Sequence, residues 1–442
     1  MCACQKSEPA KNVLLITLDT TRADRLGCYG YEKQLTPHLD RLADESVVFD
    51  MAIAQAAVTP VSHASILTGL EPYHHGLRVL HGHVANRLKD KHVTIAEVWQ
   101  EAGGQTAAFI SAYPVSKAFG LHQGFEVFND IFQPKDIANR TDALGTVNTD
   151  SGQRRADETV NAAIKWLDAY RAAEKPLLMW VHFFDPHDPR VVPPEEVLGK
   201  FIPDTDDRTE LMLHGYDCEV FYMDAQIGRL IEALKSRGLW KNTVVAVVSD
   251  HGEGLGQHNW WSHGILYQEQ IRVPLILRAP GMRHVPRVSA QVRTIDIMPT
   301  LLETAGVDRT FWRKMDGLSL VDAMRTGKTE GDLIAYSDSV NILSYGRQDD
   351  PSRFDKKHDK LYCVMQGGYK LIYHQLKPEN TEFYNLMEDP GELNNLASSK
   401  PPTMRRFMEH LNNINALSVI VPEMTATDLE RLQKLKGLGY GY

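Results

Sequence analysis

Short, almost purely apolar runs alternate with amphipathic stretches of helical length through the first two-thirds of the chain. The apolar runs predict strands at residues 13–18, 105–110, 177–184, 243–249 and 273–278. The amphipathic stretches predict helices at residues 37–45, 94–102, 156–170, 219–235 and 297–305. Strands that lack polar alternation are buried on both faces, which is typical of parallel pairing. The sequence therefore predicts an α/β fold with a large, mostly parallel sheet sandwiched by helices.

The pattern changes near residue 330. Residues 361–366 and 369–374 predict two strands, and Gly367-Gly368 between them predicts a hairpin turn. Residues 382–386 add a third strand. We therefore expect three parts: a tether at residues 1–11, a catalytic domain at 12–330, and a small α+β subdomain at 331–442 with an antiparallel sheet and C-terminal helices. Polar stretches at residues 135–157, 191–208 and 346–360 predict surface loops.

Charge and hydropathy exclude several function classes. The 442 residues include 48 Lys+Arg against 57 Asp+Glu, a net charge of −9. That balance argues against nucleic-acid binding as the main role, because phosphate backbones are held by a surplus of Lys and Arg. Hydrophobic residues make up 43% of the chain, too many for a disordered one. Its apolar runs fall well short of the roughly 20 residues that span a bilayer, so no transmembrane segment is predicted.

The five cysteines are few and scattered. They form neither a disulfide framework nor a zinc knuckle, since their number is odd and their spacing irregular. Cys2 and Cys4 stand in a polar, proline-containing tether. Such a tether predicts a periplasmic or lipid-anchored bacterial protein, and a cytoplasmic one is the alternative.

Three predicted strands end in residues suited to metal binding or acid–base chemistry. The first runs into Asp19, the third into Asp185 and His187, and the fourth into Asp250 and His251. A single Asp after a strand is usually a turn former. Ligands of open α/β sheets, however, bind at the carboxyl ends of the strands, so three such endings predict a site there.

A fourth segment, V-T-P-V-S-H-A-S-I-L-T-G at residues 58–69, predicts a short helix. Thr59 suits the N-cap, Pro60 the first helical position and Gly69 the C-terminal stop. This places a hydroxyl at the positive end of a helix, where an anionic substrate is favoured. A hydroxyl is a poor nucleophile until a metal or a base activates it.

Taken in order, these segments resemble the alkaline phosphatase superfamily, and specifically its sulfatase branch. The matching segments are L-D-T-T-R-A-D-R-L-G-C-Y-G from Leu18, S-H-A-S-I-L-T-G from Ser62, H-F-F-D-P-H-D-P from His182, S-D-H-G-E from Ser249, S-H-G-I-L-Y-Q-E-Q-I-R-V-P from Ser262, I-D-I-M-P-T-L-L-E-T-A-G from Ile295, and F-Y-N-L-M-E-D-P-G-E-L-N-N-L from Phe383. They run through nearly the whole chain.

The chain also departs from the sulfatase pattern. Thr59 stands where that family carries a Cys or Ser that becomes formylglycine, and a threonine cannot become formylglycine. His63 stands at the family's arginine position. Thr20 replaces one aspartate of the family's pair, and His263 replaces its lysine.

The resemblance is therefore closer to the threonine-nucleophile relatives, the nucleotide pyrophosphatases/phosphodiesterases and the phosphoglycerol or phosphoethanolamine transferases. It implies that Asp19, Thr59, Asp250 and His251 bind one divalent metal ion. Mixed oxygen and nitrogen ligands favour Zn²⁺ or Mn²⁺ over Ca²⁺ or Mg²⁺, although these stay open.

The sequence predicts less specific roles for five further residues. Asp185, His187 and His263 form a candidate second metal site. The alternative is that His187 and His263 act without metal, as substrate-binding donors or as the leaving-group acid. Arg22 and His63 are candidates for substrate binding, and Arg22 is also able to pair with a ligand carboxylate.

The sequence thus predicts a metal-dependent hydrolase of phosphate-type esters, either mono- or diesters, that uses Thr59 as nucleophile through a covalent intermediate. Its partner is a small anionic ester. Three alternatives stay open: a sulfate-ester hydrolase, a transferase that passes the phospho group to an alcohol, and a non-catalytic binding protein with the sulfatase fold.

Overall fold

The computed structural model describes residues 12–80, 84–132, 152–170, 175–187, 193–200, 205–340 and 359–418. The predicted tether at residues 1–11 lies outside this range. So do most of the predicted loops at 135–157 and 346–360 and part of the one at 191–208.

An eight-stranded sheet forms the centre of the molecule, in the order β10-β2-β9-β8-β1-β7-β5-β6. All five strands predicted for this region are present. The strands are β1 (Asn12–Leu18), β2 (Val47–Ile53), β5 (Gln105–Phe109), β6 (Val127–Asn129), β7 (Leu177–Phe183), β8 (Thr243–Ser249), β9 (Arg272–Arg278) and β10 (Arg287–Arg293). The apolar pattern did not predict β2, β6 and β10, of which β6 has only three residues and β10 alternates polar and apolar side chains at the sheet edge.

The prediction of a mostly parallel sheet is confirmed, with one exception. Strand β9 runs antiparallel to both of its neighbours, β2 and β8. The chain leaves the carboxyl end of β8, stays at that edge through residues 250–267 and the short helix α8 (Gln268–Ile271), and enters β9 directly. A parallel β9 would have needed a crossover back to the other edge.

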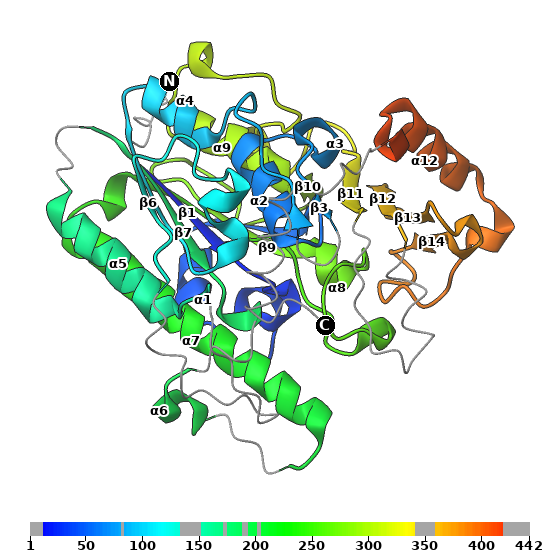
Figure 1. Cartoon of the computed structure of the whole chain (residues 1–442), viewed down its shortest axis with the longest axis horizontal. Helices are drawn as coiled ribbons and strands as arrows, with labels where there is room; N and C mark the ends of the chain where they lie inside the picture. The colour runs from blue at the N-terminus through cyan, green and yellow to red at the C-terminus, as the bar shows by residue number, and fades with distance from the viewer. Residues whose placement is uncertain are drawn as a thin grey trace, which may run out of the picture.

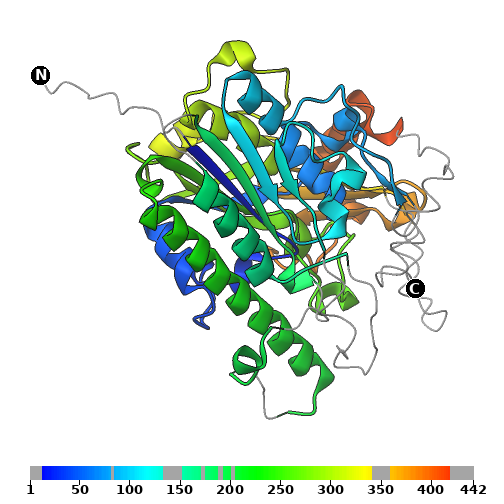
Figure 2. The same cartoon turned by 60° about the vertical axis from the view of Figure 1, so that its left-hand side comes forward.

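Helices cover both faces of this sheet, as predicted (Figure 1). In Figure 2, α5 and the long α7 lie side by side over one face. The apolar side chains of β1 alternate between the two layers, Val13 and Leu15 in one core cluster and Leu14, Ile16 and Leu18 in the other. The helices are α1 (Pro37–Asp44), α2 (Thr59–Thr68), α3 (Pro72–His75), α4 (Ile95–Glu101), α5 (Ala156–Ala169), α6 (Glu195–Leu198), α7 (Arg208–Ser236), α9 (Ile297–Thr304), α10 (Val321–Thr326) and α12 (Pro402–Asn413).

Helix α7 begins eleven residues earlier than predicted, at Arg208 in place of residue 219. The side chain of Asp207 caps it by accepting hydrogen bonds from the backbone N–H groups of Thr209 and Glu210, at 2.8 and 3.1 Å. The first turns carry exposed side chains, among them Leu211 and Met212. Because these turns cover no core, apolar periodicity did not reveal them.

A second, four-stranded sheet is antiparallel throughout, in the order β11-β12-β13-β14. Its strands are β11 (Ala335–Ser339), β12 (Leu361–Gln366), β13 (Tyr369–His374) and β14 (Glu382–Asn385). Gly367 and Gly368 both have positive φ, 61° and 74°, as the predicted hairpin turn requires. The antiparallel sheet and the helix α12 agree with the predicted architecture, whereas β11 was missed. The division at residue 330 stays a prediction.

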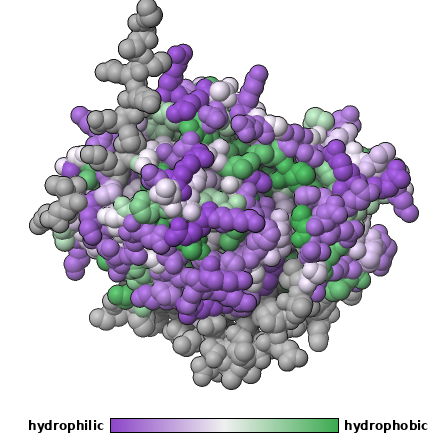
Figure 3. All heavy atoms as spheres, turned by 90° about the horizontal axis from the view of Figure 1, so that it is seen from above, coloured by the Kyte–Doolittle hydropathy of each residue, from purple (hydrophilic) through white to green (hydrophobic). Residues whose placement is uncertain are grey.

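The two sheets are joined by backbone contacts between the loop after β2 and the strand β11. Ala56 forms a parallel bridge with Asp338, and the Asp338 N–H donates to the Gln55 carbonyl at 2.9 Å. A minor two-stranded ladder pairs β3 (Val79–Leu80) with β4 (Val84–Ala85). The face in Figure 3 is mostly hydrophilic, with apolar residues in small separate areas. Among the helices described here, none combines the length and the apolar character needed to cross a bilayer.

Candidate active site

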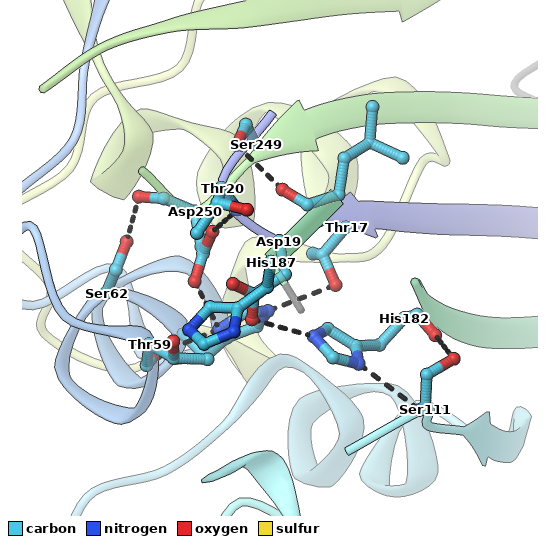
Figure 4. Close-up of polar contacts among 12 residues, drawn as sticks. Thr17, Asp19, Thr20, Thr59, Ser62, Ser111, His182, His187, Ser249 and Asp250 are labelled. Carbon is cyan, nitrogen blue, oxygen red and sulfur yellow. Dashed lines mark hydrogen bonds and ion pairs between the residues drawn. The ribbon is translucent and has the colours of Figure 1, made fainter. Parts of the chain in front are cut away.

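The carboxyl ends of β1 and β8 bring Asp19, Asp250 and His251 together, as the sequence predicts. Each offers a ligand atom, and these atoms lie within 4.8 Å of one another. All three side chains are fully buried. Figure 4 shows Asp19 and Asp250 beside Thr59, which comes from the start of α2. The carboxyl ends of β1 and β8 and the start of α2 thus meet at one site.

Each of the two carboxylates has one oxygen held by the protein and one without a hydrogen-bond partner in the described chain. Oδ1 of Asp250 accepts from the backbone N–H groups of His251 and Thr20, at 2.7 and 3.2 Å. Oδ2 of Asp19 lies 3.3 Å from Nε2 of His182. Oδ1 of Asp19 and Oδ2 of Asp250 accept no hydrogen bond from the described chain, and Asp250 Oδ2 lies 3.4 Å from His251 Nε2 and 3.5 Å from His63 Nδ1. Buried charged oxygens of this kind call for a cation.

Burial raises the pKa of Asp19 well above its usual range, and a hydrogen bond from Thr59 opposes that rise. Burial and then the charge of Asp19 raise the pKa of Asp250. Burial, with a contribution from His263, lowers the pKa of His251, which favours the neutral imidazole that binds metals. Two carboxylates and one neutral imidazole form a donor set that fits a divalent cation.

The ring of His251 has one nitrogen directed into the site. Its Nδ1 lies 2.9 Å from the Gly252 carbonyl, and because a carbonyl only accepts, Nδ1 carries the proton. Nε2 is thereby an acceptor or a ligand, and it lies 3.3 Å from Oγ1 of Thr59. Backbone contacts of this kind are how metal-binding histidines are usually oriented.

Thr59 differs in one respect from its predicted place. The N-cap of α2 is Val58, whose carbonyl accepts from Ser62 N–H at 3.0 Å, and Thr59 is the first helical residue. The Thr59 hydroxyl therefore faces His251 and does not cap the helix. Gly69 ends the helix in a left-handed conformation, as predicted. Ser62 Oγ donates to the Asp250 carbonyl at 2.6 Å, which ties α2 to the end of β8.

Thr20 sits in a strained conformation beside the carboxylates. Its φ is 50°, which is unusual for a β-branched residue. The turn directs its N–H toward Asp250, and the Tyr216 hydroxyl from α7 donates to its carbonyl at 2.8 Å. Strain of this kind persists only where the surroundings impose it, and it gathers at functional sites.

His182 also lies at this site, although no role was predicted for it from the sequence. The Ser111 N–H donates to its Nδ1 at 3.2 Å, so the proton lies on Nε2 and is donated to Asp19. Burial lowers the pKa of His182 to about 3, so the ring is neutral. His182 stands three residues before Asp185 in the sequence, but only the pairing of β7 with β1 places it against Asp19.

His187 and His263 lie together at the edge of the site, with their Nε2 atoms 3.1 Å apart. His263 Nδ1 is 3.0 Å from the Ala57 carbonyl and therefore carries a proton. The ring of His263 also lies 4.5 Å from that of His251, centroid to centroid. The structure thus brings both predicted histidines next to the candidate metal centre.

The predicted second metal set of Asp185, His187 and His263 is not assembled. Within the described residues, Asp19, Asp250 and His251 are the one group with three ligand atoms close enough for a shared ion. Asp185 points elsewhere: its Oδ1 accepts the Ala156 N–H at the start of α5, at 3.0 Å. The helix N-terminus attracts the carboxylate away from the two histidines.

Asp185 provides a prediction about stability. It is fully buried, Oδ2 has no partner in the described chain, and burial raises its pKa to about 7. A raised carboxyl pKa means that the folded state loses stability as pH rises from the unfolded value, about 4, through the folded one. We expect Asp185→Asn, which keeps an acceptor for Ala156, to stabilise the protein most at about pH 8 and not at about pH 4.

Urea unfolding at several pH values measures this difference. The exposed Asp322, substituted by asparagine, is the matched control and should show no such pH dependence. Lower stability of Asp185→Asn across the whole pH range would show that the charge itself is needed there.

Arg22 and His63, both predicted to bind substrate, are engaged by the protein. The Arg22 guanidinium pairs with Asp24 at 2.6 Å and also donates to the Glu253 carbonyl and to Gln257. None of these partners belongs to the candidate metal set. His63 is fully buried, and each of its ring nitrogens contacts a protein group.

Family comparison supports the resemblance seen in the sequence. A family model described as Sulfatase matches residues 11–307. A second, described as N-sulphoglucosamine sulphohydrolase, C-terminal, matches residues 256–416. An arylsulfatase of Clostridium perfringens is 27% identical over 457 residues, covering 88% of this chain and 90% of that protein. Iduronate 2-sulfatase of Mus musculus is 27% identical, covering 62% of this chain and 60% of that protein.

Solved structures share the fold. BT4656, in complex with its substrate D-glucosamine-2-N,6-O-disulfate, matches with a TM-score of 0.70 and 21% identity, over 91% of this chain and 97% of that one. The phosphonate monoester hydrolase of Agrobacterium radiobacter matches with a TM-score of 0.71 and 21% identity, over 93% and 96%. Both matches cover more than nine-tenths of this chain, so the predicted fold is confirmed.

Proposed function

The chain belongs to the sulfatase family, and from this premise we propose that it hydrolyses small anionic esters, with sulfate esters as the first substrate class to test. The observation that carries the proposal is the placement of the Thr59 hydroxyl, 3.3 Å from His251 Nε2 and beside two buried carboxylates with unpartnered oxygens. Relatives named as sulfatases, such as the arylsulfatase of Clostridium perfringens, favour sulfate esters. The phosphate-ester hypothesis therefore becomes the second candidate.

Asp19, Asp250 and His251 would hold one divalent cation, with Thr59 as a further ligand. Their mixed oxygen and nitrogen donors favour Zn²⁺ or Mn²⁺. Such an ion would supply positive charge that favours an ionised hydroxyl and that balances charge on the oxygens of the ester. The nucleophile and the proton donor come from side chains of the protein itself.

Thr59 is the proposed nucleophile. After its hydroxyl proton is lost to solvent, Oγ attacks the sulfur or phosphorus atom, a bond to that atom forms, and the bond to the leaving ester oxygen breaks. The N-terminus of α2, the positive end of the helix dipole, favours the negative charge of the substrate. Water then releases the group from Thr59 and restores the hydroxyl.

His187 and His263 are proposed to give the leaving oxygen its proton. Because His263 Nδ1 donates to the Ala57 carbonyl, a neutral His263 accepts at Nε2 and His187 Nε2 supplies the proton between them. In the cationic form of the pair each ring has a proton on Nδ1 and the two Nε2 atoms share a third, and transfer of that third proton to the leaving oxygen leaves both rings neutral. The 3.1 Å contact keeps both rings in place for the transfer.

Phosphate or phosphonate esters are the second candidate substrate class, and the presence of a threonine at position 59 favours them. A threonine offers an alcohol where sulfatases use a residue converted to formylglycine. The similarity in fold to a phosphonate monoester hydrolase adds to this candidate.

The test is a panel of 4-nitrophenyl esters: the sulfate, the phosphate, the phenylphosphonate, and bis(4-nitrophenyl) phosphate. Each is assayed after chelation and reloading with Zn²⁺, Mn²⁺, Mg²⁺ or Ca²⁺, against the Thr59→Ala variant. We expect metal-dependent release of 4-nitrophenolate from the sulfate ester. Turnover of the phosphorus esters alone supports the second candidate, and a product formed with added alcohol indicates a transferase. Metal binding without any turnover would contradict both hydrolase proposals.

A further inference from the structure

A chain of buried hydrogen bonds links two central strands to the first turn of α2. Trp180 Nε1 on β7 lies 2.9 Å from Thr17 Oγ1 on β1. Thr17 Oγ1 lies 3.1 Å from His63 Nε2, and His63 Nδ1 lies 2.9 Å from the Thr59 carbonyl. Trp180, Thr17 and His63 have no solvent-exposed surface. We refer to these four residues as the Trp180 relay.

The direction of each hydrogen bond in the relay follows from the chemistry of its end groups. An indole N–H only donates, so Thr17 Oγ1 accepts from Trp180, and its single proton is left to donate to His63 Nε2. A backbone carbonyl only accepts, so His63 Nδ1 carries the proton that it donates to Thr59. His63 is therefore a neutral imidazole protonated on Nδ1. Burial lowers its pKa, which agrees with the neutral form.

The relay lies beside the contact that orients Asp19. Thr17 and Asp19 are two residues apart at the end of β1, and Trp180 and His182 are two apart on β7. Residues two apart share one face of a sheet. The β1–β7 pairing therefore presents two parallel contacts to α2, Trp180 to Thr17 and His182 to Asp19. Figure 4 shows Thr17 and His182 close to Asp19 and Thr59.

We propose that His63 is a positioning residue that fixes the first turn of α2, and with it the Thr59 hydroxyl, relative to Asp19. This replaces the expectation that His63 binds substrate, since both of its ring nitrogens are used within the protein. The inference rests on the proposed function in one point, the role of Thr59 as nucleophile. Rates fall steeply when a reacting group is misplaced by about 1 Å, which is why such a support matters.

Thr17→Val tests the relay at its centre. Valine has nearly the same shape, but it removes the acceptor of Trp180 and the donor to His63. We expect kcat to fall roughly 10- to 100-fold while KM and metal affinity change little, because ground-state contacts to substrate and metal remain. Thr243→Val is the matched control. Thr243 is a buried threonine at the start of β8, far along that strand from the candidate site, and its hydroxyl donates to the Leu239 carbonyl. Removal of this hydroxyl should leave kcat unchanged.

Substitutions of His63 separate positioning from substrate binding. Asparagine can place an N–H near the position of Nδ1 and keep the bond to Thr59, whereas leucine cannot. We expect His63→Asn to retain more of kcat than His63→Leu, with KM similar in both. A raised KM with unchanged kcat in His63→Leu would show substrate binding and overturn the proposal.

A spectroscopic measurement tests the relay without turnover. In protein labelled with ¹⁵N-histidine, the ¹⁵N shifts of His63 should show a proton on Nδ1 and none on Nε2, and the Trp180 indole signal should move in Thr17→Val. A proton on Nε2, or an unchanged kcat in a folded Thr17→Val protein, would overturn the relay. Activity retained by Thr59→Ala would instead refute the proposed nucleophile and leave the tautomer result intact.

Discussion

Thr59→Ala is expected to lower kcat by roughly 10³-fold or more, because the variant lacks the atom that would form the bond to sulfur or phosphorus. Its metal content and thermal stability should stay close to those of the native protein, because Asp19, Asp250 and His251 remain as ligands. Thr59 is 3% exposed and its hydroxyl does not cap α2, so removal of the hydroxyl costs the helix no cap.

Two variants on the same helix serve as controls. Thr59→Ser restores an alcohol at the same position and should recover much of the activity. Thr68→Ala removes a buried hydroxyl at the other end of α2, one that donates to the Ala64 carbonyl, and should leave kcat unchanged. Acid quenching during turnover should trap a mass increase on a peptide containing Thr59. Full activity in Thr59→Ala would exclude the assignment.

Asp250→Asn should abolish metal binding and lower activity by a similar order, roughly 10³-fold. Asn keeps an acceptor for the N–H groups of Thr20 and His251 but replaces the unpartnered Oδ2 with a neutral donor. The measurement is metal content by elemental analysis, together with thermal unfolding with and without a chelator.

A chelator should lower the melting temperature of the native protein and leave that of Asp250→Asn unchanged. In the native protein a chelator removes an ion that binds the folded state, so the melting temperature falls. The pKa values of Asp19 and Asp250 are raised in the absence of metal, so the metal-free protein should lose stability as pH rises above about 4. Asp250→Asn removes one of these two buried carboxylates and should be the more stable protein when both are metal-free at neutral pH.

A buried carboxylate elsewhere is the matched control. Asp224 on α7 accepts from the N–H groups of His38 and Leu39 and lies outside the candidate metal set. Asp224→Asn should retain metal and activity. If Asp250→Asn also retained its metal, the proposed ligand set would be wrong.

The sequence predicted much of the fold from local patterns. Apolar runs marked the five predicted central strands, and Gly367-Gly368 marked the hairpin. It also predicted that Asp19, Asp250 and His251 meet, because each follows a strand and the carboxyl ends of parallel strands share one edge. The departure at Thr59 and the histidines at 63 and 263 were equally visible from the sequence.

Other features depend on which strands and helices are neighbours. Asp185 was assigned to a second metal set, yet it faces the N-terminus of α5, because the sequence predicts where that helix begins but not which side chains of other segments lie beside it. The antiparallel direction of β9 follows from a chain that never crosses back over the sheet. His182 contacts Asp19 only because β7 pairs with β1.

By itself, then, the sequence determined the α/β architecture, the residue types of the candidate metal centre and the presence of a threonine in place of a formylglycine precursor. The tertiary structure alone decided how the side chains are used. In it both nitrogens of His63 contact protein groups, Asp185 faces the start of α5, and one oxygen each of Asp19 and Asp250 accepts no hydrogen bond from the described chain. The reason is physical: local patterns fix which surfaces are buried, whereas hydrogen-bond partners are set by contacts between residues far apart in the chain.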